Sequence, residues 1–142
     1  MTALLDLIRG EELSAARLLR IFRDGYLEAE LDTEGDVRLT LDGISILVTV
    51  DVSRRLIHFI SIFGVKPGAT HQQVLELCNR INDRLILVRA THPSALRSPA
   101  VMLDHYVVTE AGVSAEELVD DVRRFRTVIG SVPPLNTEDI LS

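Results

Sequence analysis

The stretch that decides the fold is residues 37–63, which read VRLTLDGISILVTVDVSRRLIHFISIF. Apolar and polar residues alternate along its three runs, 37–41, 44–51 and 56–63, with the period of two that indicates β-strands. Asp42-Gly43 joins the first two runs, and this dipeptide tolerates the positive φ angles of a tight primed turn. The stretch therefore predicts an antiparallel meander of three strands.

The turns of the meander also predict its register. A two-residue turn at Asp42-Gly43 places six apolar side chains on one face, which we expect to be the core face: Val37, Leu39, Leu41, Ile44, Ile46 and Val48. A two-residue turn at Ser53-Arg54 would continue this face through Ile57, Phe59 and Phe63. A one-residue bulge in the third strand would instead turn these last three side chains outward.

The opposite face of the meander is less polar than a face in contact with water should be. It carries Arg38, Thr40 and Ser45, but also a group of apolar residues around a histidine: Leu47, Leu56, His58, Ile60 and Ile62. A contiguous apolar patch of this kind usually marks an interface. We expect these five residues to bind a protein, either a partner or client segment or a second copy of the chain.

Helical and strand patterns flank the meander. Residues 12–24 have apolar positions near helical spacing, at Leu13, Ala16, Leu19 and Ile21 or Phe22, and Gly25 stands where a C-cap belongs. Capping boxes open two further helices, one after Thr70 and one after Ser114. Strand patterns occur at residues 26–31, 85–88 and 101–108.

The order of elements is thus helix, strands, helix, two strands, helix. This order predicts an α+β fold with an antiparallel sheet of five to six strands flanked by three helices. We expect a single domain over residues 1–131 and a flexible C-terminal tail over residues 132–142.

Composition excludes several classes of function. Fifteen basic and 21 acidic residues give a net charge of −6, which disfavours binding to nucleic acid. The absence of an uncharged apolar run near ~18 residues predicts no membrane span, and the start of the chain lacks the pattern of a secretory signal. A lone cysteine, Cys78, shares an apolar helix face and is expected to pack in the core. We therefore expect a cytoplasmic protein.

No pattern in the chain predicts catalysis. Residues 64–70 contain Gly, Lys and Thr between a strand and a helix, but Lys66 precedes Gly68 and Pro67 removes an amide donor, so the geometry of a phosphate-binding loop is missing. The four histidines lie on different elements with no i, i+4 pair. We expect no enzyme activity, no catalytic residue, no metal and no cofactor, although a zinc site assembled from distant elements stays open.

Several short motifs resemble the YbjN family of bacterial proteins over residues 13–129. The motifs are Gly25-Tyr26, Asp36-Val37, Asp42-Gly43, Asn79-Arg-Ile-Asn82, Arg89 and Ala111-Gly-Val-Ser114. The resemblance implies a fold similar to that of type III secretion chaperones and a chaperone-like or regulatory role without chemistry. It also implies a protein partner and a homodimer. Asn82, near the end of its helix, is interpreted as a C-cap.

A second hypothesis comes from a different class of protein. A small-molecule sensor or small enzyme would hold its ligand in a pocket between sheet and helices, where His58 or Tyr106 could contact a metabolite. A pocket with converging polar groups would favour this hypothesis, whereas an open apolar face would favour the interaction module.

Overall fold

The computed structural model describes residues 6–142 and confirms the α+β fold. The antiparallel sheet has the strand order β1-β2-β3-β4-β6-β5. Its six strands are β1 (Glu28–Leu31), β2 (Val37–Leu41), β3 (Ile44–Asp51), β4 (Leu56–Gly64), β5 (Arg89–Thr91) and β6 (Ala100–Val108).

Three α-helices accompany the sheet: α2 (Ala15–Asp24), α3 (His71–Arg84) and α4 (Ala115–Ile129). Two short 3₁₀ helices, η1 (Gly10–Glu12) and η2 (Pro133–Leu135), precede α2 and follow α4. None of the helices in residues 6–142 combines the length and the apolar character that crossing a bilayer requires.

The chain divides into two compact units. The first contains the described residues up to 59 together with 106–124, and the second contains residues 60–105 and 125–142. Three elements, β4, β6 and α4, have residues in both units. The single domain over residues 1–131 stays a prediction, and each unit is described below by itself.

In the first unit, the meander has the register that its turn predicts. Val37 pairs with Val48, Leu39 with Ile46, and Leu41 with Ile44. Asp42 and Gly43 both have positive φ angles, 47° and 79°, which a type I′ turn requires at its two central positions. The local chemistry of this dipeptide therefore sets the pairing of β2 with β3.

We expect the substitution Gly43→Ala to lower the free energy of unfolding by about 1 kcal/mol, because a residue with a Cβ is strained in the left-handed backbone conformation. A Cβ at this position would meet no heavy atom within 4 Å, so the cost comes from the backbone alone. Gly43→Asn should cost less, since Asn adopts positive φ more readily. Urea unfolding of both variants measures the difference, and equal losses would contradict this explanation.

The core face of the meander is also the predicted one. Val37, Leu39, Ile46, Ile57 and Phe59 are all fully buried. The burial of Ile57 and Phe59 excludes the bulge that would have turned them outward. The ends of the predicted face are less covered, since Ile44 and Phe63 are only half-buried.

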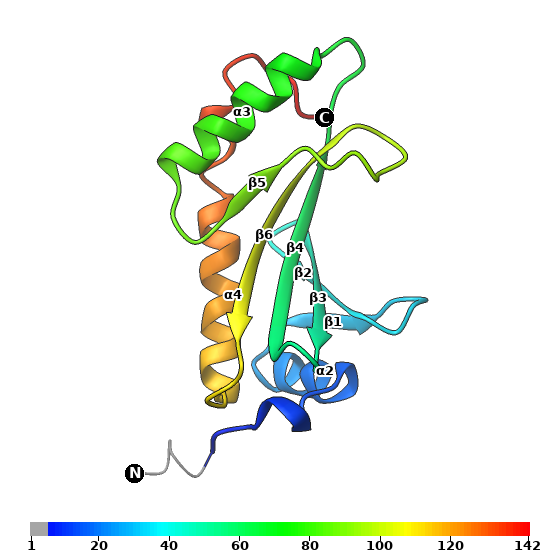
Figure 1. Ribbon diagram of the computed structural model, residues 1–142. Coiled ribbons are helices and arrows are strands. Elements are labelled where there is room, and N and C mark those ends of the chain that lie inside the picture. The colour runs from blue at the N-terminus through cyan, green and yellow to red at the C-terminus, as the bar shows by residue number, and fades with distance from the viewer. Residues whose placement is uncertain (1–5) are drawn as a thin grey trace. The chain divides into compact units, whose positions relative to one another are not determined.

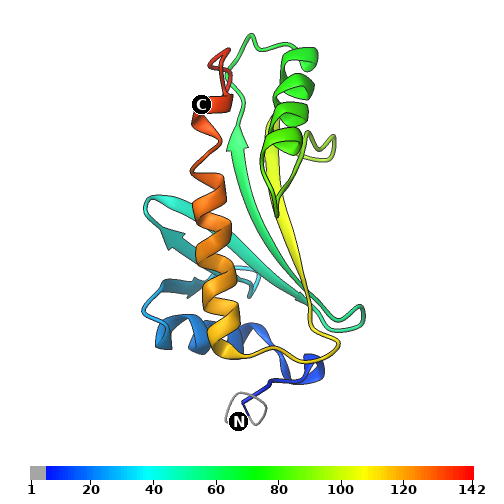
Figure 2. The ribbon, with the colours of Figure 1, turned by 90° about the vertical axis from the view of Figure 1, so that its left-hand side faces the viewer.

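Helix α2 packs on β1 and β2 within the first unit (Figures 1 and 2). The hydroxyl of Ser14 caps it by accepting a hydrogen bond from the amide of Arg17 at 3.1 Å. Its buried side chains are Leu18, Ile21 and Phe22, whereas Ala16 is exposed. The prediction of Ala16 as a core position was wrong and Leu19 is only half-buried, because the stripe of Leu18, Ile21 and Phe22 is the one buried in the core.

Gly25 follows α2, as predicted, but for a different reason. Its φ is −82°, and the left-handed conformation falls instead on the exposed Tyr26, with φ 64°. A Cβ on Gly25 would lie 2.7 Å from Cγ2 of Val119 in α4, so this position needs glycine for close packing. Tyr26 consequently lies outside the strand predicted for residues 26–31, and β1 starts at Glu28.

In the second unit, α3 begins with the predicted capping box. The Thr70 hydroxyl accepts from the amide of Gln73 at 3.1 Å, and the Gln73 side chain accepts from the amide of Thr70 at 2.8 Å. The buried face of α3 consists of Val74, Leu77, Cys78 and Ile81, as predicted. Burial also raises the pKa of the Cys78 thiol, which disfavours the reactive thiolate.

Residues 85–88 do not form the predicted strand. They are the connection from α3 to β5, where Ile86 and Leu87 are exposed and Leu87 has a φ of 62°. The strand starts at Arg89 because β5 is fixed by its pairing with β6, in which Arg89 lies opposite Asp104 and Ala90 opposite Leu103. A run of four apolar residues can thus lie outside the core when the residues that follow it in the sequence are the ones that pair in the sheet.

The side chain of Asn82 completes β5 rather than capping α3. Its Oδ1 accepts from the amide of Ala90 at 2.8 Å, and its Nδ2 donates to the carbonyl of the same residue at 3.1 Å. An amide side chain therefore occupies the hydrogen-bonding positions that a further strand would use. This arrangement protects the edge of the sheet from pairing with another chain (Figure 1 shows α3 beside β5).

The C-terminal segment, for which a flexible tail is predicted, makes contacts in the second unit. The amide of Lys66 donates to the carbonyl of Ile140 at 2.7 Å, and the amide of Ser142 donates to the carbonyl of Gly64 at 2.9 Å. Val132 and Ile140 are buried. The flexible tail over residues 132–142 stays a prediction, and hydrogen exchange at the amide of Ser142 would test it.

Candidate functional site

The five residues predicted to bind a protein lie on β3 and β4, on the face opposite the buried core side chains. Leu47, Leu56 and His58 belong to the first unit and are half-buried. Ile60 and Ile62 continue along β4 in the second unit, where Ile62 is 52% exposed. The alternating burial of β3 and β4, in which Ile46, Val48, Ile57, Phe59 and Ser61 are covered, shows that these residues point to the other face of the sheet.

His58 is stacked on an aromatic side chain from another strand. The rings of His58 and Tyr106 lie with their centroids 4.0 Å apart and their planes at 5°. Tyr106 is 39% exposed, and Val108, two residues further along β6, is 65% exposed. The first unit therefore presents a surface of Leu47, Leu56, His58, Tyr106 and Val108, which we call the outer surface.

Tyr106 and Val108 were missing from the predicted interface. The alternation along β6 places them on one face, but that signal does not say which strand β6 neighbours. Only the strand order, with β6 next to β4, explains why Tyr106 reaches His58. A parallel-stacked pair of this kind fixes two large side chains in an exposed position, which lowers the entropic cost of binding through them.

Charged residues border the outer surface. Arg38, which pairs with Leu47 across β2 and β3, donates to the Ser45 hydroxyl at 3.0 Å and lies 3.6 Å from the carboxylate of Asp32. At the β3–β4 turn, Arg54 donates to Asp51 at 2.7 Å. The hydrogen bonds from Arg54 and then Ser53 lower the pKa of Asp51 from 3.8 to about 2. An apolar centre with a polar border is the anatomy of a protein–protein interface.

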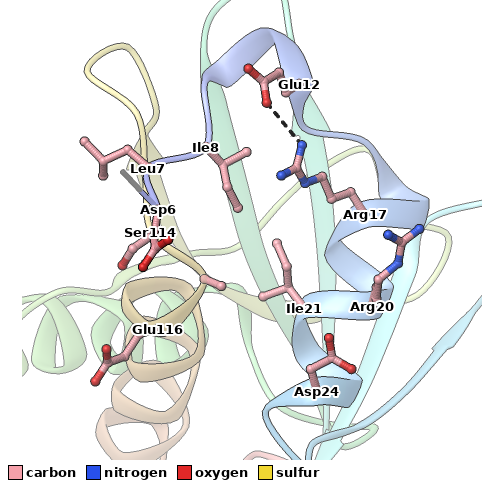
Figure 3. A pocket seen from close by; sticks show the side chains of 11 residues that line it. Asp6, Leu7, Ile8, Glu12, Arg17, Arg20, Ile21, Asp24, Ser114 and Glu116 are labelled. Atoms are coloured by element: carbon pink, nitrogen blue, oxygen red, sulfur yellow. Dashed lines mark hydrogen bonds and ion pairs between the residues drawn. The ribbon is translucent and has the colours of Figure 1, made fainter. Parts of the chain in front are cut away.

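A cavity of about 720 Å³ lies elsewhere in the first unit, between α2 and the first turn of α4 (Figure 3). Ile8 and Ile21 form its apolar part, and Arg17 and Arg20 project from α2 along one side. Arg17 is paired with Glu12 at 3.2 Å. Neither His58 nor Tyr106 lines the cavity, so the ligand contacts suggested for those two residues do not occur there.

Apart from Leu7, the rest of the cavity lining is acidic or small. Asp24 lies below Arg20 on α2, and Ser114 and Glu116 lie at the start of α4 on the opposite side of the cavity (Figure 3). The Ser114 hydroxyl is engaged in capping α4, where it accepts from the amide of Glu117 at 3.0 Å. A smaller apolar recess of about 270 Å³ continues along Gly25 and Val119. Within the described lining, no nucleophile is paired with a base.

Comparison with solved structures shows the same fold in proteins of low sequence identity. YbjN from E. coli, described as "a putative transcription regulator", has a TM-score of 0.76 at 19% identity, with 92% of this chain and 96% of that chain covered. The Yersinia pestis type III secretion chaperone SycH, solved with a fragment of YscM2, has a TM-score of 0.53 at 13% identity, with 86% and 99% covered. The HopA1–SchA chaperone–effector complex has a TM-score of 0.52 at 12% identity, with 78% and 88% covered.

Sequence comparison identifies the family. No curated protein matches the chain. The family model YbjN, described as "Putative bacterial sensory transduction regulator", matches residues 14–132, which contain every strand and all three α-helices. The chain therefore belongs to the YbjN family.

Proposed function

We propose that this protein is a non-enzymatic interaction module, chaperone-like or regulatory, that binds another protein through the outer surface and the residues Ile60 and Ile62 that follow on β4. The observation that carries the proposal is the exposed apolar and aromatic group around the His58–Tyr106 stack. Aromatic side chains in fixed positions are the usual anchors of protein interfaces. Exposed apolar groups bordered by charges have few other uses in a protein surrounded by water.

Two of the structurally similar proteins support this proposal. SycH and SchA are solved with protein partners, a YscM2 fragment and the effector HopA1. We infer a protein partner for this chain from the analogy with these folds and from the outer surface. We also propose that the protein is cytoplasmic. We expect no nucleic acid, cofactor or membrane among its partners.

We further propose a homodimer, in which a second copy of the chain covers part of the outer surface. Light scattering of the full chain at micromolar concentration should then show a species of twice the monomer mass of 15.8 kDa. A single species at the monomer mass would contradict the homodimer. The outer surface would then be available to a different protein, and binding of that protein would be measured in a separate experiment.

The cavity supports a second candidate function, that of a small-molecule sensor. Its volume of about 720 Å³ falls within the ~300–1,000 Å³ of ligand sites, and charged groups meet an apolar floor there. A ligand bound in it should raise the melting temperature of the wild type but not of Arg20→Glu. Tyr106→Ala, on the outer surface, should keep the ligand-induced shift and lose protein binding, which separates the two functions.

A further inference from the structure

Two histidines that are distant in the sequence meet in the second unit. His71 is the first residue of α3, and His92 directly follows β5. Their ring centroids lie 5.2 Å apart, with the ring planes at 45°. No local spacing predicts this pair, because the packing of α3 against β5 brings it together.

The separation of the two rings suits ligands of a single metal ion. Imidazole nitrogens bind Zn²⁺ at about 2.0–2.1 Å, so two rings on one tetrahedral ion have their centres roughly 5 Å apart. The observed separation of 5.2 Å agrees with this value. The tilt of the two rings also differs from the parallel stack of His58 on Tyr106, whose centroids lie 4.0 Å apart with the planes at 5°.

The hydrogen bond of His92 prepares its other ring nitrogen for a metal. Nδ1 of His92 lies 2.9 Å from the carbonyl oxygen of Ala100, and a carbonyl oxygen only accepts hydrogen bonds. Nδ1 therefore carries the proton, and in the neutral ring Nε2 has the free lone pair. Metal-binding histidines commonly donate their second nitrogen to a backbone carbonyl in this way, which fixes both tautomer and ring orientation.

Hydrogen bonds also fix the backbone that carries the two rings. The capping box of Thr70 and Gln73 fixes the first turn of α3, where His71 lies. The two hydrogen bonds between Asn82 and Ala90 hold β5 against α3, two residues before His92. A site needs such support to keep its ligands in position before the ion arrives.

We propose that His71 and His92 form a two-histidine site for a divalent transition-metal ion of the zinc class. Water completes the coordination, since within residues 6–142 no three His, Cys, Asp or Glu side chains gather as a metal site. His71 is exposed, which gives the ion access from solvent. Bound metal would link the start of α3 to the end of β5, and its two protein ligands imply a modest affinity suited to reversible binding.

Calorimetric titration of the untagged, chelator-treated full chain with Zn²⁺ tests the proposal. We expect one ion per chain, no binding of Mg²⁺, and a loss of at least about tenfold in Zn²⁺ affinity in His71→Ala. His92→Asn should lose as much affinity, and it keeps an amide donor for the carbonyl of Ala100. The matched control His105→Ala removes a histidine from β6 and should leave the affinity unchanged.

Three results would overturn the site. One is the absence of Zn²⁺ binding in the wild type up to millimolar concentration. Another is unchanged affinity in His71→Ala or in a folded His92→Asn, which would mean adventitious binding elsewhere. The third is an equal loss in His105→Ala. As a second readout, Zn²⁺ should raise the melting temperature of the wild type and of His105→Ala, but not of His71→Ala.

Discussion

Replacement of both Leu47 and Ile62 by Asp should abolish binding through the outer surface and the residues that follow it on β4, while the protein stays folded. Truncation of a hot-spot residue at the centre of an interface costs about 2 kcal/mol or more, and a carboxylate at such a position would also be desolvated. We therefore expect the dissociation constant of the homodimer, or of a partner complex, to rise at least about hundredfold. Leu47 is half-buried and Ile62 half-exposed, so the two changes should spare the core.

A matched control separates loss of the interface from a general effect of charge. Val52 is 46% exposed in the turn between β3 and β4 and lies outside the proposed surface. Val52→Asp should therefore leave association unchanged, as measured by sedimentation or light scattering over a concentration series. Unchanged association in the Leu47→Asp, Ile62→Asp variant, or its unfolding in circular dichroism, would rule out this surface.

The second large effect is expected at an ion pair in the second unit. Asp104 on β6 is 1% exposed, and Arg89 on β5 donates to both of its carboxylate oxygens, at 3.0 Å from Nε and 2.7 Å from a terminal nitrogen. Arg89→Ala removes both bonds and leaves a buried carboxylate with less compensation. We expect a loss of about 2 kcal/mol in the free energy of unfolding. This is less than the ~3–5 kcal/mol lost when a fully buried ion pair is broken, because Arg89 is 58% exposed.

Two variants distinguish geometry from charge at this pair. Arg89→Lys keeps the charge but not the bidentate fork, so it should recover only part of the lost stability. Arg54→Ala breaks an exposed Arg–Asp pair of the same 2.7 Å length and should change stability little. Urea unfolding of the three variants gives the comparison. Equal losses in Arg89→Ala and Arg54→Ala would show that the burial of Asp104 does not determine the cost.

The limits of sequence-based prediction are clearest where a side chain meets a residue far along the chain. Asn82 was interpreted as a cap because helix ends favour Asn, yet its partner is the backbone of Ala90. Gly25 is the C-cap of α2, as predicted, and its small size also allows the close approach of Val119. In the first case the tertiary neighbour replaces the predicted role, and in the second it adds a role that local spacing does not reveal.

The sequence by itself determined the elements whose causes are local. Alternation and the Asp42-Gly43 turn set the register of β2 and β3, and the capping box at Thr70 set the start of α3, because these interactions involve residues few positions apart. Only the tertiary structure decided that residues 85–88 form no strand, that His58 stacks on Tyr106, that His71 meets His92, and that a cavity lies between α2 and α4. These features depend on which elements become neighbours in space, and neighbours are chosen by the burial of the whole core rather than by local spacing.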